Sequence, residues 1–252
     1  MLEIYQHDGE IRELCLARPP VNALDPTLLH ALYEAIQAAE REEVAGLILS
    51  GAPGLFSAGL DLPILLTLDR DTLVKVWHDF FGSAELLACS SMPCVAAVTG
   101  HSPAGGAVLA ICCDYRIMAR GSYQIGLNEV QVGLTVPGVI GQALARLTGP
   151  YRAERLLVSG SLLESDAALA CGFIDELCEV DQVRNRALAW LQELLALPRK
   201  AMLETRAMVR SDLAKAFADP ERLPIAAFND GWFHPQTQRA LRATVERIQK
   251  KS

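Results

Sequence analysis

The sequence lacks any run of basic residues. Its 252 residues include 23 Lys and Arg against 30 Asp and Glu, and the formal net charge at pH 7 is −7. The basic side chains are scattered along the chain, which argues against a nucleic-acid-binding protein. A composition that is 51% hydrophobic and 21% charged is typical of a folded protein with a sizeable core. The length suits one large domain, or one domain with a small appendage.

Cysteine motifs are also lacking. None of the seven cysteines forms a CxxC pair, and none lies at a metal-ligand spacing from the five histidines. We therefore expect no metal site and no disulfide framework. The odd count and the apolar settings indicate reduced, buried thiols, which are typical of a cytoplasmic protein.

No targeting segment or membrane span is evident. The N-terminal stretch "MLEIYQHDGEIREL" is polar and acidic, unlike a signal or transit peptide. The stretch from Ser90 to Cys113 carries no formal charge, but Pro93, Gly100 and Pro103 interrupt it. A strand, a tight loop and a buried helix explain this stretch better than a membrane span does. We therefore expect no membrane association.

Short apolar, β-branched runs alternate with helical patterns, which predicts an α/β fold. The predicted strands are 11–17, 45–51, 94–100 and 115–119, and the predicted helices are 27–42, 71–89, 104–113 and one after Pro137. Strand signals fade after about residue 140, except for "FIDEL". We expect an α/β core over residues 1–196. Residues 197–252 read as a C-terminal helical region that packs on this core or on a neighbouring subunit.

Two glycine-containing turns each follow a predicted strand. The first is "GLFSAGLDLP" (54–63), in which Asp61 is placed to cap a helix, and the second is "TGHSPAGGAVLAICCD" (99–114). Small residues let the backbone approach a ligand closely, and the N–H groups at the start of a helix are unpaired. Each turn could donate one N–H to a developing negative charge, and two such donors form an oxyanion hole. Taken alone, either turn could be merely a tight strand-to-helix connection.

The second turn also resembles the nucleophile elbow of an α/β-hydrolase, with Ser102 as the nucleophile. In that fold the N–H of the residue after the serine helps to bind the oxyanion. Here that residue is Pro103, which has no N–H. The sequence therefore argues against a hydrolase.

A single charge lies in the apolar stretch "IGLNEVQVGL" (125–134), and that charge is Glu129. An ionised carboxylate among apolar neighbours is costly unless it is paired, neutralised or used. The carboxylate could be a surface group at a strand end. With two candidate oxyanion turns in the same chain, a catalytic base is the better interpretation.

These motifs together resemble the crotonase (enoyl-CoA hydratase/isomerase) superfamily. The resemblance is carried by "FSAGLDL" (56–62), "PAGGAVLAICCDYRI" (103–117) and "IGLNEVQVGL" (125–134), and by "RPPVNALD" (18–25) at the start of the coenzyme A site. It implies a spiral of ββα units followed by C-terminal helices that build a homotrimer, often paired into a hexamer. It also implies an acyl-CoA thioester as substrate and no separate cofactor.

The resemblance assigns roles to residues of this sequence. The thioester oxygen would sit on the backbone N–H groups of Ala58 and Gly105, and Glu129 would be the acid/base residue. Further substrate contacts are expected from the coenzyme A segment, the first turn and the neighbour of Glu129, namely Arg18, Val21, Ala23, Gly59, Leu60, Asp61, Leu62 and Asn128.

The pattern of carboxylates separates two reactions within the superfamily. Hydratases resemble one another in having a glutamate three residues after the oxyanion-hole glycine and a second glutamate later. Here the first position is Val108 and only the second, Glu129, is present. This pattern is similar to mitochondrial-type Δ3,Δ2-enoyl-CoA isomerases of fatty acid β-oxidation, which shuttle one proton with a single glutamate. The alternatives are a hydratase-like or other crotonase-type enzyme, and a non-enzymatic acyl-CoA-binding protein.

Several other side chains are expected to have structural roles. Trp77, Phe80 and Phe81 lie at helical spacing and read as core rather than acyl pocket. His101 reads as structural or solvated rather than as a proton carrier. Arg18 is a better candidate for the coenzyme A phosphates than Arg199 or Lys200, which read as solvated surface residues.

Overall fold

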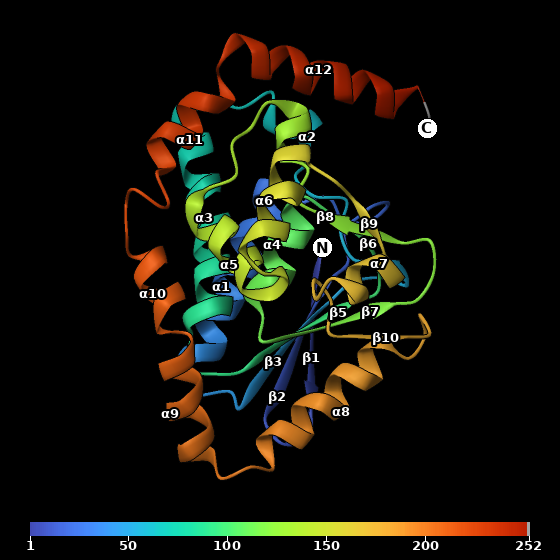
Figure 1. Ribbon diagram of the computed structural model, residues 1–252, viewed down its shortest axis with the longest axis vertical. Helices are drawn as coiled ribbons and strands as arrows, with labels where there is room; N and C mark the ends of the chain where they lie inside the picture. Colours follow the sequence, from blue (N-terminus) through green and yellow to red (C-terminus); the bar gives the residue numbers. More distant parts are fainter. Residues whose placement is uncertain (251–252) are drawn as a thin grey trace.

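The computed structural model describes residues 1–250, which form two β-sheets surrounded by helices (Figure 1). The larger sheet has six strands in the order β1 (Leu2–His7), β2 (Ile11–Leu16), β3 (Gly46–Ser50), β5 (Cys94–Val98), β7 (Tyr115–Ala119) and β10 (Glu176–Cys178). The strands from β2 to β10 pair in parallel, and β1 pairs antiparallel with β2 at the edge.

Helices cover both faces of the six-stranded sheet at β3 and β5, which explains why every residue of these two strands is buried. In β3, Leu47 and Leu49 pack in the main core, whereas Ile48 packs in a second cluster on the opposite face. The main core is formed against α1 (Pro26–Arg41), α3 (Arg70–Cys89) and α4 (Gly105–Cys112), and the second against α8 (Val183–Leu195). The alternation follows from the two-residue period of a strand.

The helix boundaries agree with the capping residues in the sequence. Asp25 accepts a hydrogen bond from the backbone N–H of Leu28 and Pro26 opens α1. Asp61 caps the short helix α2 (Leu62–Leu65) in the same way. A side-chain acceptor at this position satisfies one of the unpaired N–H groups of the first turn.

The smaller sheet positions the functional motifs. It contains β4 (Gly54–Leu55), β6 (Gly100–Pro103), β8 (Gln124–Gly126) and β9 (Leu163–Glu164) in that order. The first three are parallel, and β9 is antiparallel to β8. The contact between β4 and β6 requires glycine, since a Cβ on Gly100 would lie 1.9 Å from the carbonyl carbon of Gly54.

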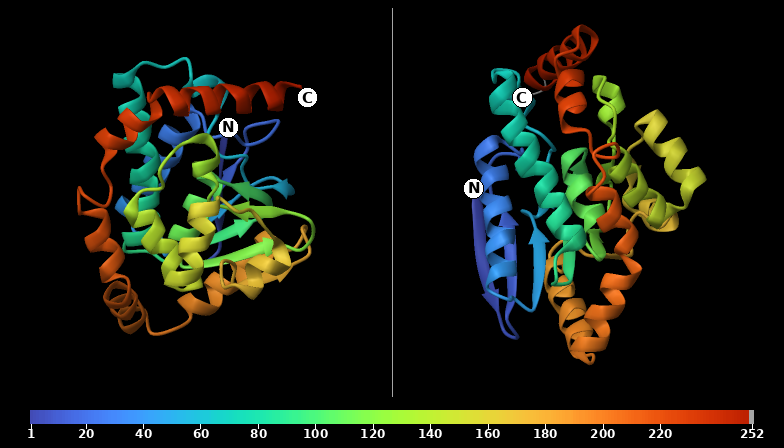
Figure 2. Two further views of the ribbon diagram at one scale, coloured as in Figure 1. Left: turned by 45° about the horizontal axis from the view of Figure 1, so that its top comes forward. Right: turned by 90° about the vertical axis from the view of Figure 1, so that its left-hand side faces the viewer.

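After β8, the described chain forms further helices besides β9, β10 and α8. They are the 3₁₀ helix η1 (Glu129–Val132), α5 (Gly138–Thr148), α6 (Pro150–Ser159), α7 (Ser165–Ala170), α9 (Arg199–Val209), α10 (Ser211–Phe217), α11 (Ile225–Trp232) and α12 (Pro235–Gln249). Figure 2 shows α9 to α12 running as an arc along the flank of the molecule, with α12 across one end. Both α10 and α11 contact α3, and α12 contacts α2 and η1. The helices α10, α11 and α12 therefore pack on other elements of their own chain.

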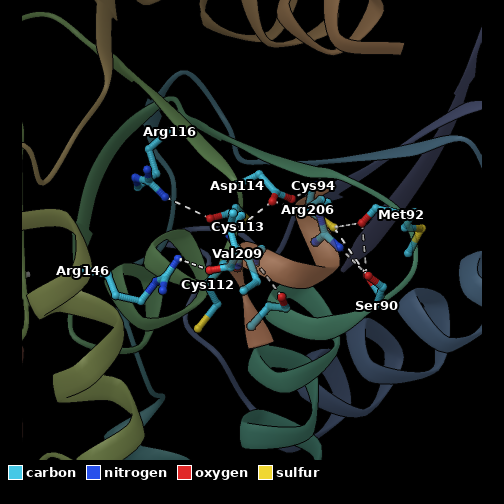
Figure 3. A network of polar contacts seen from close by, with 12 residues as sticks. Ser90, Met92, Cys94, Cys112, Cys113, Asp114, Arg116, Arg146, Arg206 and Val209 are labelled. Carbon is cyan, nitrogen blue, oxygen red and sulfur yellow. Dashed lines mark hydrogen bonds and ion pairs between the residues drawn. The ribbon is translucent and has the colours of Figure 1, made fainter. Parts of the chain in front are cut away.

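Asp114 links the C-terminal helices to the core through hydrogen bonds and ion pairs. It follows α4, and it accepts hydrogen bonds from Arg206 Nε (2.9 Å) and from the backbone N–H of Cys94 (2.7 Å). Arg210 forms an ion pair with the same carboxylate at 3.2 Å. Figure 3 shows Arg206 lying between Asp114 and the carbonyl oxygen of Ser90, to which it donates a second hydrogen bond.

No helix within residues 1–250 has the length and apolar character that crossing a membrane requires. The charge-free stretch 90–113 forms β5, β6 and α4, as expected. Within the same residues, no group of His, Cys, Asp or Glu side chains is arranged to hold a metal ion.

Candidate active site

The three segments that carry the motifs lie next to one another, because β4, β6 and β8 are adjacent parallel strands. The strand β4 begins the first turn, β6 lies in the second turn, and β8 is followed by Glu129. The backbone N–H of Ala104 donates to the carbonyl of Gly126 (2.8 Å), which holds the last two segments together. The carboxyl ends of parallel strands gather loop residues at one edge of a sheet, and here they gather the two glycine turns and the carboxylate.

The two glycine turns touch each other. A Cβ on Gly59 would lie 3.5 Å from the backbone nitrogen of Gly105. Gly59 has φ +83°, a conformation that favours glycine. Its carbonyl accepts from the N–H of Leu24 (2.8 Å), so this residue builds the turn and does not line the cavity.

The two candidate oxyanion donors differ in whether their backbone N–H is already hydrogen-bonded. Gly105 is the first residue of α4, and its backbone N–H has no hydrogen-bond partner within residues 1–250. Ala58, in contrast, donates its N–H to the carbonyl oxygen of Val21 at 3.0 Å. Of the two predicted donors, the N–H of Gly105 is free to donate to a ligand, whereas the N–H of Ala58 must share or exchange its bond to Val21.

A cavity of 570 Å³ opens beside these turns. Of the predicted site residues, all except Gly59 line it, namely Arg18, Val21, Ala23, Ala58, Leu60, Asp61, Leu62, Gly105, Asn128 and Glu129. The remaining wall is largely apolar and includes Phe80, Phe81, Val108, Val132, Leu134, Val136, Ile140 and Phe228. An apolar cavity with a few convergent polar groups is the usual form of a small-molecule site.

Glu129 lies in the wall of this cavity. The residue keeps some exposed surface, but its Oε2 atom is enclosed and has no hydrogen-bond partner in the described part of the chain. Burial raises the pKa of this carboxyl to about 7, partly offset by a hydrogen bond from its own backbone N–H. A carboxylate with a raised pKa is a better proton acceptor than an ordinary surface glutamate. The neighbouring Asn128 Oδ1 is also buried and has no hydrogen-bond partner among residues 1–250.

The other carboxylate in the cavity wall is engaged. Asp61 pairs with Arg18 Nη2 at 2.8 Å and also caps α2. Arg18 forms a second ion pair with Asp25 at 3.0 Å and donates to the carbonyl of Ala23. The guanidinium of Arg18 therefore has its charge balanced by two carboxylates, and it braces the 18–25 segment against the first turn.

The serine of the second turn lies in a closed environment. Ser102 is fully buried, and its hydroxyl has no partner within residues 1–250. The adjacent His101 accepts a hydrogen bond from the backbone N–H of Gln124 (3.1 Å) and packs edge-on against Tyr123. Within residues 1–250, no histidine is hydrogen-bonded to Ser102, which argues against a hydrolase, and the contacts of His101 are to Gln124 and Tyr123.

Some cavity residues were not predicted from the sequence. Phe80 and Phe81 were expected only in the core, but both also line the cavity, whereas Trp77 packs against Phe228 and Trp232 as expected. The C-terminal helices add Phe228 from α11 and Thr244 and Ile248 from α12. The four-residue spacing of Thr244 and Ile248 indicates one face of a helix, but not what that face covers. Arg199 and Lys200 lie outside the cavity wall.

The fold and the site together define a crotonase-type protein. The profile of the Enoyl-CoA hydratase/isomerase family matches residues 6–250, and the chain belongs to this family. This confirms the resemblance carried by the three motifs.

The relatives include both reaction types. The chain is 33% identical over 239 residues to mouse "Enoyl-CoA delta isomerase 1, mitochondrial", covering 94% of this chain and 83% of that protein. It is 35% identical over 235 residues to a "Probable enoyl-CoA hydratase" of Mycolicibacterium paratuberculosis, covering 89% of each. Among solved structures, human mitochondrial delta3-delta2-enoyl-CoA isomerase superposes with a TM-score of 0.93 at 30% identity, over 100% of this chain and 99% of the other.

Proposed function

We propose that this protein is a Δ3,Δ2-enoyl-CoA isomerase, which converts 3-enoyl-CoA into 2-trans-enoyl-CoA. One observation carries the proposal. Among residues 1–250, the cavity wall holds two carboxylates, and only Glu129 is unpaired, because Asp61 is engaged by Arg18. A double-bond shift needs one proton carrier, whereas hydration also needs a group that activates water.

The reaction follows from the positions of these groups. The thioester oxygen accepts hydrogen bonds from the backbone N–H of Gly105 and, after exchange with the Val21 carbonyl, from that of Ala58. Glu129 removes a proton from C2, the electrons of the C2–H bond form a C1=C2 bond, and the C1=O electrons move onto the thioester oxygen, which gives a dienolate that keeps the C3=C4 bond. The same carboxyl returns the proton to C4, which completes the shift. When C4 is protonated, the C1=O bond is restored, the C1=C2 electrons form C2=C3, and the C3=C4 electrons form the new C–H bond at C4. Backbone donors stabilise the enolate because they are fixed before the charge develops.

The apolar position of Val108 supports this assignment. Its side chain is buried in the cavity wall, one turn along α4 from Gly105. A valine neither orients nor deprotonates a water molecule at C3. The runner-up is a hydratase-like reaction, which is favoured by the probable hydratases among the relatives and by the unpartnered Asn128 Oδ1 beside Glu129.

The proposal includes the wider setting of the enzyme. We place the substrate with its coenzyme A part toward the 18–25 segment and with its pantetheine along Leu60, Asp61 and Leu62. The enzyme would serve fatty acid β-oxidation as a homotrimer or hexamer in the cytoplasm, without a separate cofactor.

A paired assay tests the function. The protein is supplied with 3-enoyl-CoA, and formation of the conjugated product is followed. It is then supplied with trans-2-enoyl-CoA, and 3-hydroxyacyl-CoA is followed. The isomerase assignment predicts that the first rate exceeds the second by about 10²–10⁴, the usual contribution of one acid/base group. A faster second rate would identify a hydratase, and CoA-ester binding without either reaction would identify a binding protein.

A further inference from the structure

Glu129 lies on a very short element, so its position depends on what holds that element. The helix η1 has only four residues, and its own hydrogen bonds run from the N–H of Gln131 to Asn128 O (3.0 Å) and from the N–H of Leu134 to Glu129 O (3.1 Å). These bonds fix the shape of the turn. They do not fix its distance from the two glycine turns.

Two contacts from outside η1 hold it in place. On one side, the Gln131 side chain donates to the carbonyl of Gly160, at the end of α6 (2.9 Å). On the other side, the Thr237 hydroxyl of α12 donates to the carbonyl of Gly133, the residue that ends η1 (2.9 Å). Thr237 is 3% exposed, and a Cβ on Gly133 would lie 3.2 Å from the Cα of Thr237. The two backbones are therefore in direct contact.

The same face of α12 that holds η1 also lines the cavity. Thr237, Leu241, Thr244 and Ile248 follow one another at spacings of four, three and four residues, which places them on one stripe of the helix. Leu241 is fully buried, and Thr244 and Ile248 line the cavity. One rigid helix thus contacts both the space for the acyl-CoA and the turn that carries Glu129.

We propose that Thr237 is a positioning residue that sets the distance of Glu129 from the substrate through its hydrogen bond to Gly133. This inference depends on the proposed role of Glu129 as the base. The hydroxyl closes the turn from the α12 side, so that the carboxylate stays enclosed and within reach of both C2 and C4. Small displacements of a base reduce turnover more than they reduce binding, because the reacting atoms must be aligned.

Thr237→Val tests this role, since valine keeps the approximate shape and removes the hydroxyl. We expect kcat for double-bond migration to fall about tenfold and KM to change less than about twofold. The acid limb of the pH–rate profile should move below pH 7, because a displaced Glu129 gains water and its pKa falls toward the ordinary glutamate value. Thr237→Ser retains the hydroxyl and should restore most of the rate and the original acid limb. Thr237→Ala provides the same test if valine cannot be accommodated beside Gly133.

Thr148→Val is the matched control. Thr148 is also buried, and its hydroxyl donates to a backbone carbonyl, that of Leu144 (3.2 Å), but it lies outside the cavity wall and does not bond to η1. We expect this change to leave kcat and the acid limb unchanged. The inference is overturned if Thr237→Val retains the wild-type kcat and acid limb, or if Thr237→Ser is as impaired as Thr237→Val. Glu129→Gln, measured in the same assays, distinguishes failure of the proposed function from failure of this inference. If Glu129→Gln is active, the proposed function is overturned. If Glu129→Gln is inactive but Thr237→Val has the wild-type rate, only the role of Thr237 is overturned.

Discussion

The carbonyl oxygen of Val21 accepts a hydrogen bond from the backbone N–H of Ala58, at 3.0 Å. The carbonyl belongs to the 18–25 segment in the cavity wall, and the N–H belongs to the first glycine turn. Asn22 fixes the segment, since its side chain accepts from the N–H of Arg18 (2.8 Å) and donates to the carbonyl of Phe56 (3.2 Å). One of the two proposed oxyanion donors is therefore occupied by the protein itself.

The first prediction concerns this bond. In a complex with acetoacetyl-CoA, the thioester oxygen should lie about 2.7–3.1 Å from the backbone nitrogens of Gly105 and Ala58, the distance range of an oxyanion hole. The Val21 carbonyl should then be farther from Ala58 than it is in the free protein. A crystal structure of the complex measures these distances. A thioester oxygen remote from both nitrogens would refute the assignment of the donors.

The rate should depend on pH through Glu129. Burial raises the pKa of this carboxyl to about 7, and only the ionised form can accept a proton from C2. Activity should therefore decline as the pH falls through about 7, whereas an ordinary exposed glutamate would remain ionised down to about pH 4.3. The pH profile of kcat/KM measures this limb in the free enzyme. A rate that stays constant from pH 8 down to pH 5 would contradict the enclosed position of the carboxylate.

The free energy of unfolding should change with pH in the opposite direction to the rate, falling as the pH rises. Because the pKa of Glu129 is higher in the folded state than in the unfolded state, the folded state binds the proton more tightly. This contribution is fully present below about pH 4.3, and it is lost as the pH rises through about 7. Removing the charge by Glu129→Gln should therefore stabilise the protein at pH 8 relative to pH 5, by up to about 3 kcal/mol. Urea unfolding of both proteins at the two pH values measures the difference. An equal effect at both values would contradict the raised pKa.

The link between the C-terminal helices and the core should be sensitive to Asp114. Its side chain is 14% exposed, and those of Arg206 and Arg210 are 10% and 13% exposed, so Asp114→Ala leaves two mostly buried guanidinium groups without their carboxylate. We expect a loss of about 3–5 kcal/mol in the free energy of unfolding. The exposed pair of Lys200 and Glu204 is the control, since Glu204→Ala should cost less than about 1 kcal/mol. Similar losses for both variants in urea unfolding would show that Asp114 does not anchor the helices.

The parts of the fold that could be predicted from the sequence are those in which local pattern and burial agree. The strand Gly46–Ser50 is apolar throughout because both of its faces are covered, and the caps at Asp25 and Asp61 follow from local chemistry. The edge strand Leu2–His7 was missed because its residues are largely exposed and polar. The turn Asp8-Gly9 that joins it to β2 was the available hairpin signal.

Some residues of the candidate site could not be predicted from the sequence, for a different reason. Ten residues that the motifs indicated, among them Gly105 and Glu129, line the cavity, since the residues of each motif lie close together in the sequence. The motifs did not predict Phe228 or Thr244, which reach the cavity through packing of helices more than 90 residues beyond Glu129. The bond between Val21 and Ala58 was also beyond sequence reasoning, because it is a contact between two loops.

Glu129→Gln tests the central claim most directly, since glutamine keeps the shape of the side chain and cannot accept the proton. The measurement is the rate of conversion of 3-enoyl-CoA, with the affinity for a non-reacting acyl-CoA determined on the same preparation. Glu154→Gln, on the exposed face of α6, is the control for a change of one surface charge. The account predicts that turnover falls by about 10²–10⁴ while affinity remains close to that of the unchanged protein. A variant that retains most of the original rate would contradict the account, because the double-bond shift would then proceed without Glu129.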